Sequence, residues 1–182
     1  TLTINKKAVA IAGNTDTKVY NGSEQSVSGY TPEGLEAPEA TVVLKEGKEA
    51  VAKGTEASSD KYMMGLTKDD FVIMEGDKDA TSNYEITYTD GSLVITPLDG
   101  VAVVTANDAT YTYDGTAKGG NGATAEGLLE GHRLEEVEVS GSQTDAGTYP
   151  NELVPSNAKI VDEAGNDVTG NYANISYVRG TL

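Results

Sequence analysis

Three glutamates in the second half of the chain, Glu135, Glu136 and Glu138, have the spacing most suggestive of acid–base chemistry. Glycoside hydrolysis needs two carboxyl groups about 5 to 9 Å apart across a cleft. On an extended strand Glu136 and Glu138 point to the same side, because side chains alternate with a period of two. Solvation of an outer strand face therefore explains these residues better than catalysis does.

A nucleophile activated by a base is the second chemistry to consider. His132 is the single histidine, and Ser142 lies in a glycine-flanked turn. A catalytic base needs a positioned nucleophile and a partner that orients it, and the sequence marks neither beside His132. We expect a loop histidine and no catalytic residues, so the chain is predicted not to be an enzyme.

The segment DEAGND, residues 162–167, has the oxygen density of a calcium loop. It lacks the alternating ligands and the distal bidentate Glu of an EF-hand. Asp, Asn and Gly also gather in turns, where they tolerate positive φ and accept hydrogen bonds from backbone amides. A turn is the favoured interpretation, calcium binding stays open as a hypothesis, and no metal or cofactor is predicted.

Tyrosine is the remaining candidate for ligand contact, since the chain has ten Tyr, one Phe and no Trp. Tyrosine rings with a polar edge suit sugar stacking, but small β domains also use half-buried Tyr in their cores. Tyr30 and Tyr111 have no counterpart elsewhere in the chain and are the predicted contact residues. The others considered form matched pairs, which favours core packing: Tyr20 with Tyr113, Tyr84 with Tyr172, and Tyr88 with Tyr177.

Composition sets the class of protein. The 182 residues carry a formal net charge of −16, so nucleic-acid phosphates and anionic membranes are not expected as partners. Glycine is abundant at 21, and Thr, Val, Ile and Tyr crowd the periodic segments, which predicts a mostly β fold. With no cysteine there are no disulfides and no thiol catalysis. No apolar run approaches about 18 residues, so membrane insertion is not expected.

The chain repeats itself. Tyr20-Asn21-Gly22 matches Tyr113-Asp114-Gly115 at an offset of 93, as does the motif EGL at residues 33–35 and 126–128. The motif NY recurs at residues 83–84 and 171–172, at an offset of 88. The first copy carries about eight extra residues within KEGKEAVAKGTEA, which we interpret as a loop insertion.

Each copy is predicted to close with a hairpin. Asp90-Gly91 lies between alternating residues and suits a two-residue type I′ turn, which places Tyr88 opposite Leu93. In the second copy Arg179-Gly180 takes the same place and sets Tyr177 opposite Leu182. The opening TLTI reads as the last strand of a preceding copy, with Leu2 and Ile4 in the places of Leu93 and Ile95.

These signals predict two small antiparallel-sheet domains in tandem. Residues 1–4 belong to a preceding repeat, residues 5–97 form the first domain and residues 98–182 the second. An immunoglobulin-like sandwich and an open β-grasp-like sheet with a short helix both fit the number of strands.

At these residues the chain resembles the MBG and YDG-type tandem repeats of bacterial surface proteins. The motifs that carry the resemblance are KVYNG at residues 18–22, YDGT at 113–116, GSQTDAGTY at 141–149 and GNDVTGNY at 165–172. The first copy lacks the GSQTDAGTY motif. The resemblance implies a β-rich repeat without enzymatic activity, in an extracellular, cell-wall or cell-surface attached protein of the adhesin type.

The resulting expectation is a structural stalk or spacer that presents an adhesive region. Its partners are expected to be the adjacent repeats of the same chain, with the fragment itself a monomer. The alternative is a module that binds a host glycan or protein through the first-copy insertion and exposed tyrosines.

Overall fold

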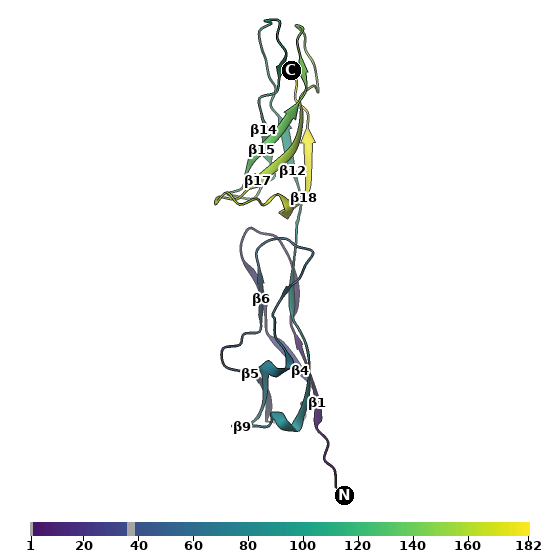
Figure 1. The fold of residues 1–182 in the computed structure, drawn as a ribbon, viewed down its shortest axis with the longest axis vertical. Coiled ribbons are helices and arrows are strands. Elements are labelled where there is room, and N and C mark those ends of the chain that lie inside the picture. The colour runs from purple at the N-terminus through teal and green to yellow at the C-terminus, as the bar shows by residue number, and fades with distance from the viewer. Residues whose placement is uncertain (1, 36–38) are drawn as a thin grey trace. The chain divides into compact units, whose positions relative to one another are not determined.

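The fold was analysed in a computed structural model, which describes residues 2–35 and 39–182. Strands account for 52% of the residues and helical turns for 5%, so the predicted mostly β fold is confirmed (Figure 1). Within the described residues the helical turns are all of the 3-10 type, and the short α-helix of the β-grasp alternative is not seen. The chain forms two compact units.

Unit 1 consists of residues 1–19 and 23–96. Its strands pair in the orders β10-β1-β4, β2-β11-β7, β5-β8-β9 and β3-β6. The strands are β1 (Lys7–Gly13), β2 (Thr15–Val19), β3 (Gln25–Ser28), β4 (Tyr30–Glu33), β5 (Ala40–Leu44), β6 (Val51–Gly54), β7 (Tyr62–Met63), β8 (Phe71–Glu75), β9 (Lys78–Asp79), β10 (Tyr84–Thr89) and β11 (Ser92–Thr96), with 3-10 turns η1 (Lys68–Asp70) and η2 (Thr81–Asn83).

Unit 2 consists of Tyr20–Gly22 and residues 97–182. Its strands pair in the orders β14-β12-β18, β15-β17 and β13-β16. The strands are β12 (Leu98–Ala106), β13 (Lys118–Gly119), β14 (Ala123–Glu126), β15 (Arg133–Ser140), β16 (Ser142–Gln143), β17 (Val154–Val161) and β18 (Tyr172–Val178), with the 3-10 turn η3 (Thr169–Asn171).

The two units use the same strand pairing. In unit 1, Ala10 of β1 lies opposite Glu33 of antiparallel β4. In unit 2, Val103 of β12 lies opposite Glu126 of antiparallel β14, which is the same pair moved by 93 residues. The other neighbour is parallel in both units, β10 beside β1 and β18 beside β12. The offset found between sequence motifs is therefore also the offset between hydrogen-bond registers.

Both predicted hairpins are wrong, and the sheets are mixed rather than purely antiparallel. Tyr88 pairs with Ile11 in parallel β1, while Leu93 pairs with Tyr62 of β7 and with Asp16 of β2. In unit 2 Tyr177 pairs with Val104 of β12. Asp90-Gly91 is thus a corner at which the chain leaves one sheet for another.

Close backbone contact explains this corner. A Cβ on Gly13 would lie 2.3 Å from the Gly91 nitrogen, and a Cβ on Gly91 would lie 2.6 Å from the Asn14 carbonyl oxygen. The Asp90 carboxylate accepts hydrogen bonds from the Gly65 amide at 2.9 Å and from the Tyr88 hydroxyl at 2.8 Å. At this strand crossing the glycines permit close approach of two backbone segments, and Gly91 is not among the glycines with positive φ.

Aliphatic residues on alternate strand positions build each core. In unit 1 Val9, Ile11, Phe71 and Ile73 are buried, with Tyr30 and Tyr88 packed against Phe71. Unit 2 has one cluster of Ala102, Ile160, Val168 and Tyr172, and a second of Ala106, Ala109 and Leu153, on which Leu182 packs. Burial of these residues supplies the main stabilisation of each unit.

The stretch LEEVEV at residues 134–139 of β15 is irregular. The pairing of β15 with β17 shifts between Leu134 and Glu136 and again between Glu136 and Glu138. At the second shift β17 carries Asn157 with φ of 52°, and its side-chain amide donates to Glu138 at 2.7 Å. Asparagine suits a positive φ better than most residues do.

Candidate functional site

The candidate site is a groove in unit 2 with a volume of about 450 Å³. One wall is the segment that follows β12, the other is the loop after β16, and Thr181 and Leu182 form the floor. Tyrosines lie on both walls. The residues of the first wall include Tyr111, Tyr113, Thr116 and Lys118, and those of the second run from Gln143 to Tyr149.

Tyr111 is held in this wall by two contacts. Its hydroxyl donates to the Gly119 carbonyl at 3.1 Å, and the Lys118 ammonium lies 5.9 Å from the centre of its ring. The ring is 47% exposed, so one predicted contact residue does lie in a concave surface. A cation over an exposed tyrosine ring contributes about 0.5–1 kcal/mol.

Asp114 shapes the turn above Tyr111. Its carboxylate accepts hydrogen bonds from the Thr116 amide at 2.9 Å and from the Lys118 ammonium at 2.6 Å. The bond from Lys118, followed by those from Thr116, holds the pKa of Asp114 well below its usual range. The carboxylate stays charged through the physiological range and acts as a fixed acceptor for the turn rather than as an acid.

The second wall is joined to the floor. The Tyr149 amide donates to the Leu182 carbonyl at 2.8 Å, and the Leu182 amide donates to the Tyr149 carbonyl at 3.1 Å. The Tyr149 hydroxyl donates to the Asp145 carbonyl at 3.0 Å, which ties the loop to itself. The groove therefore has one wall ordered by Asp114 and the other by backbone pairing with residue 182.

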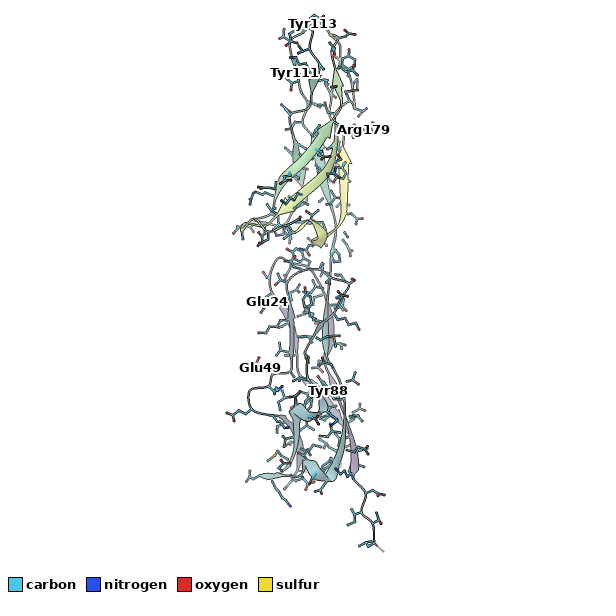
Figure 2. The ribbon with its side chains drawn as sticks, viewed as in Figure 1. Glu24, Glu49, Tyr88, Tyr111, Tyr113 and Arg179 are labelled. Carbon is cyan, nitrogen blue, oxygen red and sulfur yellow. The ribbon has the colours of Figure 1, made fainter. Side chains whose placement is uncertain are left out.

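Tyr113 is a residue of the groove that the sequence interpretation missed. Its matching with Tyr20 suggested a shared core role, yet Tyr113 is 64% exposed and Tyr20 only 3%. Figure 2 shows Tyr111 and Tyr113 on the same segment between β12 and β13. Their spacing of two in a threonine-rich stretch, TYTYDGT, was the available signal, because exposed strands display alternate residues together.

Tyr30, the other predicted contact residue, contributes to the core of unit 1. It is half-buried, its ring meets Phe71 edge-on at 5.0 Å, and its hydroxyl donates to the Val42 carbonyl at 2.9 Å. Burial raises its pKa above the usual value for tyrosine. Of the two candidates, Tyr111 is the one that is exposed and lines the groove.

The glutamates of β15 bind neighbouring side chains. Glu136 forms an ion pair with Lys159 of β17 at 3.4 Å, and Glu138 accepts the bond from Asn157 already described. Glu135 pairs with Arg133 at 3.1 Å. All three glutamates are exposed on this sheet. These contacts are those expected of solvent-exposed side chains on paired strands.

His132 and Ser142 lie at opposite ends of β15, whose eight residues span roughly 25 Å at the usual rise. The His132 Nδ1 is 2.7 Å from the Tyr172 hydroxyl oxygen. The same oxygen accepts a hydrogen bond from the Leu129 amide at 3.1 Å. A hydrogen bond between His132 and Ser142 is excluded by this separation.

The acidic segment of residues 162–167 forms a turn. The Asp162 carboxylate accepts from the Asn166 amide at 2.8 Å and from the Asn166 side chain at 2.9 Å, and these bonds lower its pKa. Asp167 accepts from the Thr169 amide at 3.0 Å. Over residues 2–35 and 39–182, no group of three or more His, Cys, Asp or Glu has the arrangement of a metal site.

The extra residues of the first copy are not a free loop. Within them Val51–Gly54 form β6, which pairs with β3, and Ala52 is fully buried. The turn at Lys45 to Lys48 is exposed, and there Lys48 forms a 2.8 Å ion pair with Asp70. Removing residues 45–57 would therefore delete a core strand together with the turn.

None of the helices in the described part of the chain is long and apolar enough to cross a membrane. Comparisons with protein-family models, with curated proteins and with solved structures return no match to this chain.

Proposed function

We propose that this chain is a non-enzymatic structural repeat of a bacterial cell-surface protein, which acts as a stalk or spacer and presents an adhesive region. The observation that supports the proposal is the strand register shared by the two units at an offset of 93 residues. Repeat proteins build length by adding copies of one module, and each copy carries its own core. The resemblance of motifs such as GNDVTGNY to surface-protein repeats supplies the expected location outside the cell.

The contacts made by several acidic side chains support this proposal. The carboxylates of Glu136 and Glu138 bind cross-strand partners, and Asp114 and Asp162 accept hydrogen bonds within turns. Each group stabilises local structure that a spacer needs. The net charge of −16 keeps such a module soluble and repels like-charged neighbours.

Small-angle X-ray scattering of the 182-residue chain tests the spacer role. Two modules in series, with strands of about 10 residues and a rise of about 3.3 Å, are expected to reach on the order of 60 to 80 Å. A particle of that length supports a spacer. A maximum dimension close to that of residues 98–182 alone would show side-by-side packing and contradict it.

Binding of a glycan is the second candidate function, and the exposed rings of Tyr111 and Tyr113 beside the groove favour it. Aromatic faces stack on sugar rings, and Lys118 and Asp145 supply polar groups nearby. A glycan array probed with the chain and with a Tyr111→Ser, Tyr113→Ser variant tests it. Binding lost in a variant that keeps its circular dichroism supports this function, and no bound glycan rejects it.

A further inference from the structure

Two asparagines of the chain are followed by glycine, Asn21 in the turn after β2 and Asn121 just before β14. Both asparagines are exposed to solvent. At such a pair the backbone nitrogen of the glycine can attack the side-chain carbonyl carbon of the asparagine, because glycine has no side chain to hinder the approach. The backbone around each pair decides whether the two atoms meet.

The turn at Asn21-Gly22 has a close counterpart in unit 2. The matched pair, 93 residues further on, is Asp114-Gly115, and the φ angles of Gly22 and Gly115 are 78° and 77°. In the second turn the Asp114 carboxylate accepts a hydrogen bond from the Thr116 amide at 2.9 Å. This bond closes a ring in which the side chain folds back over the intervening peptide bond.

An asparagine in this turn has its side chain placed for attack. Ser23 follows Gly22 as Thr116 follows Gly115, so its amide can serve as the same donor. With the side-chain oxygen directed to that amide, Cγ of Asn21 lies close to the Gly22 nitrogen, and holding two reacting atoms together accelerates their reaction. Within residues 2–35 and 39–182 the Gly22 amide donates no hydrogen bond, so its nitrogen is available.

Asn121-Gly122 shares the dipeptide but not the turn. The Gly122 carbonyl accepts a hydrogen bond from the Asn107 amide at 3.0 Å, directly before the pairing of Ala123 with Ala106. The φ of Gly122 is 121°, far from the value common to the two matched glycines. Because this backbone continues the pairing of β14 with β12, it resists the rotation that ring closure requires. Asn121 is therefore an internal comparison for Asn21.

We infer that Asn21-Gly22 is a self-modifying site, at which Asn21 converts to aspartate or isoaspartate. The Gly22 nitrogen loses its proton to solvent and attacks Cγ of Asn21. The bond between Cγ and Nδ2 then breaks, and the leaving nitrogen takes a proton from water and departs as ammonia. Water opens the resulting succinimide at Cγ to give aspartate, or at the main-chain carbonyl carbon to give isoaspartate. Either product carries one more negative charge.

The two products differ in their effect on unit 2. Aspartate at residue 21 reproduces the YDG sequence of residues 113–115. Isoaspartate instead adds a carbon atom to the main chain next to Tyr20, which is 3% exposed and whose ring centre lies 6.1 Å from that of His132. Both of these residues belong to unit 2. The isoaspartyl product is therefore expected to disturb the packing of Tyr20, and the aspartyl product to preserve it.

Peptide mapping by mass spectrometry tests the inference on the 182-residue chain, incubated at mildly alkaline pH with and without guanidinium chloride. Conversion raises the mass of a peptide by about 1 Da, and chromatography separates the aspartyl and isoaspartyl forms. Folding is expected to leave the rate at Asn21 unchanged or to raise it, and to slow conversion at Asn121 several-fold. The unfolded chain corrects for the different residues that follow each glycine, Ser23 and Ala123.

An Asn21→Gln variant is the matched control. Its longer side chain would have to close a larger ring, so conversion at residue 21 is expected to disappear while that at Asn121 is unchanged. A native rate at Asn21 several-fold below its unfolded rate would overturn the inference, because the turn would then protect the pair. Equal ratios of native to unfolded rate at the two asparagines would overturn the turn as the cause.

Discussion

The two units differ in what lies beside the segment that follows Asp90-Gly91 in unit 1 and Arg179-Gly180 in unit 2. In unit 1, β11 continues for five residues between β2 and β7, and its apolar side chains are buried. In unit 2 the corresponding path holds Thr181 and Leu182 and then a groove lined by tyrosines. On one framework, the matched tyrosines therefore differ in burial, since Tyr20 is 3% exposed and Tyr113 beside the groove is 64% exposed.

Matched isoleucines provide the strongest test of the shared framework. Ile73 on β8 and Ile160 on β17 are both fully buried. Replacing either by Ala is expected to cost about 2–5 kcal/mol, from lost transfer free energy and the cavity left behind. Urea unfolding followed by circular dichroism measures the cost. If the framework is shared, the two variants lose similar amounts, whereas a loss in only one of them would break the comparison.

The strand crossing offers a contrast between the units. Gly13 and Ala106 are matched positions, and a Cβ on Gly13 would lie 2.3 Å from the Gly91 nitrogen. Gly13→Ala is expected to cost about 1–3 kcal/mol, because backbone must move to admit the methyl group. The matched control Ala106→Gly is expected to cost only about 0.5–1 kcal/mol, since unit 2 already accepts a Cβ there. If Gly13→Ala left the melting temperature unchanged, the backbone at the crossing would have room for a methyl group, contrary to this description.

Two threonines support the same backbone position in each unit. The Thr81 hydroxyl oxygen accepts the Ile73 amide at 2.9 Å, and that of Thr169 accepts the Ile160 amide at 2.8 Å. Replacing either by Val leaves a part-buried amide unpaired, at an expected cost of about 1–3 kcal/mol. Thr→Ser at each position keeps the hydroxyl and is the control. Equal losses for the Ser and Val variants in urea unfolding would remove the hydrogen bond as the cause.

The smallest effect is expected at the ion pair between Lys48 and Asp70 in unit 1. The hydrogen bond from Lys48, followed by bonds from Thr67, lowers the pKa of Asp70 to about 2. Since the folded pKa lies below the usual value of 3.8 for an aspartate, this stabilisation is present above about pH 4 and is lost as the pH falls toward 2.

Lys48→Met is expected to raise the pKa of Asp70 toward, but not to, 3.8, because the bonds from Thr67 remain. Carboxyl ¹³C titration measures the shift, and acid unfolding should then begin at a higher pH. An unchanged pKa in this variant would show that Lys48 is not the main cause.

Periodicity and repeated motifs were sufficient to predict the class of fold and the offset between the copies. Strands β10 and β18 both begin at the Tyr of the repeated NY motif, because alternation and turn residues are local signals. The hairpins were wrong because Asp-Gly marks a tight backbone position without telling which strands meet there. Parallel pairing of β1 with β10 joins residues 77 positions apart, and no local pattern encodes such a contact.

The sequence indicated one residue of the candidate groove but not the others, because burial also depends on contacts between strands that are distant in sequence. Tyr111 was selected because it lacks a counterpart, and it does line the groove. Tyr30 also lacks a counterpart, yet it fills space beside Phe71, which depends on packing between strands distant in sequence. Tyr113 was missed because a sequence match to Tyr20 does not imply equal burial.

Nuclear Overhauser contacts between strands test the shared framework most directly. In the isotopically labelled 182-residue chain, we expect backbone contacts between Ile11 and Tyr88 in unit 1 and between Val104 and Tyr177 in unit 2, as parallel pairing requires. Cross-strand contacts between Tyr88 and Leu93, or between Tyr177 and Leu182, would instead show hairpins and contradict the account.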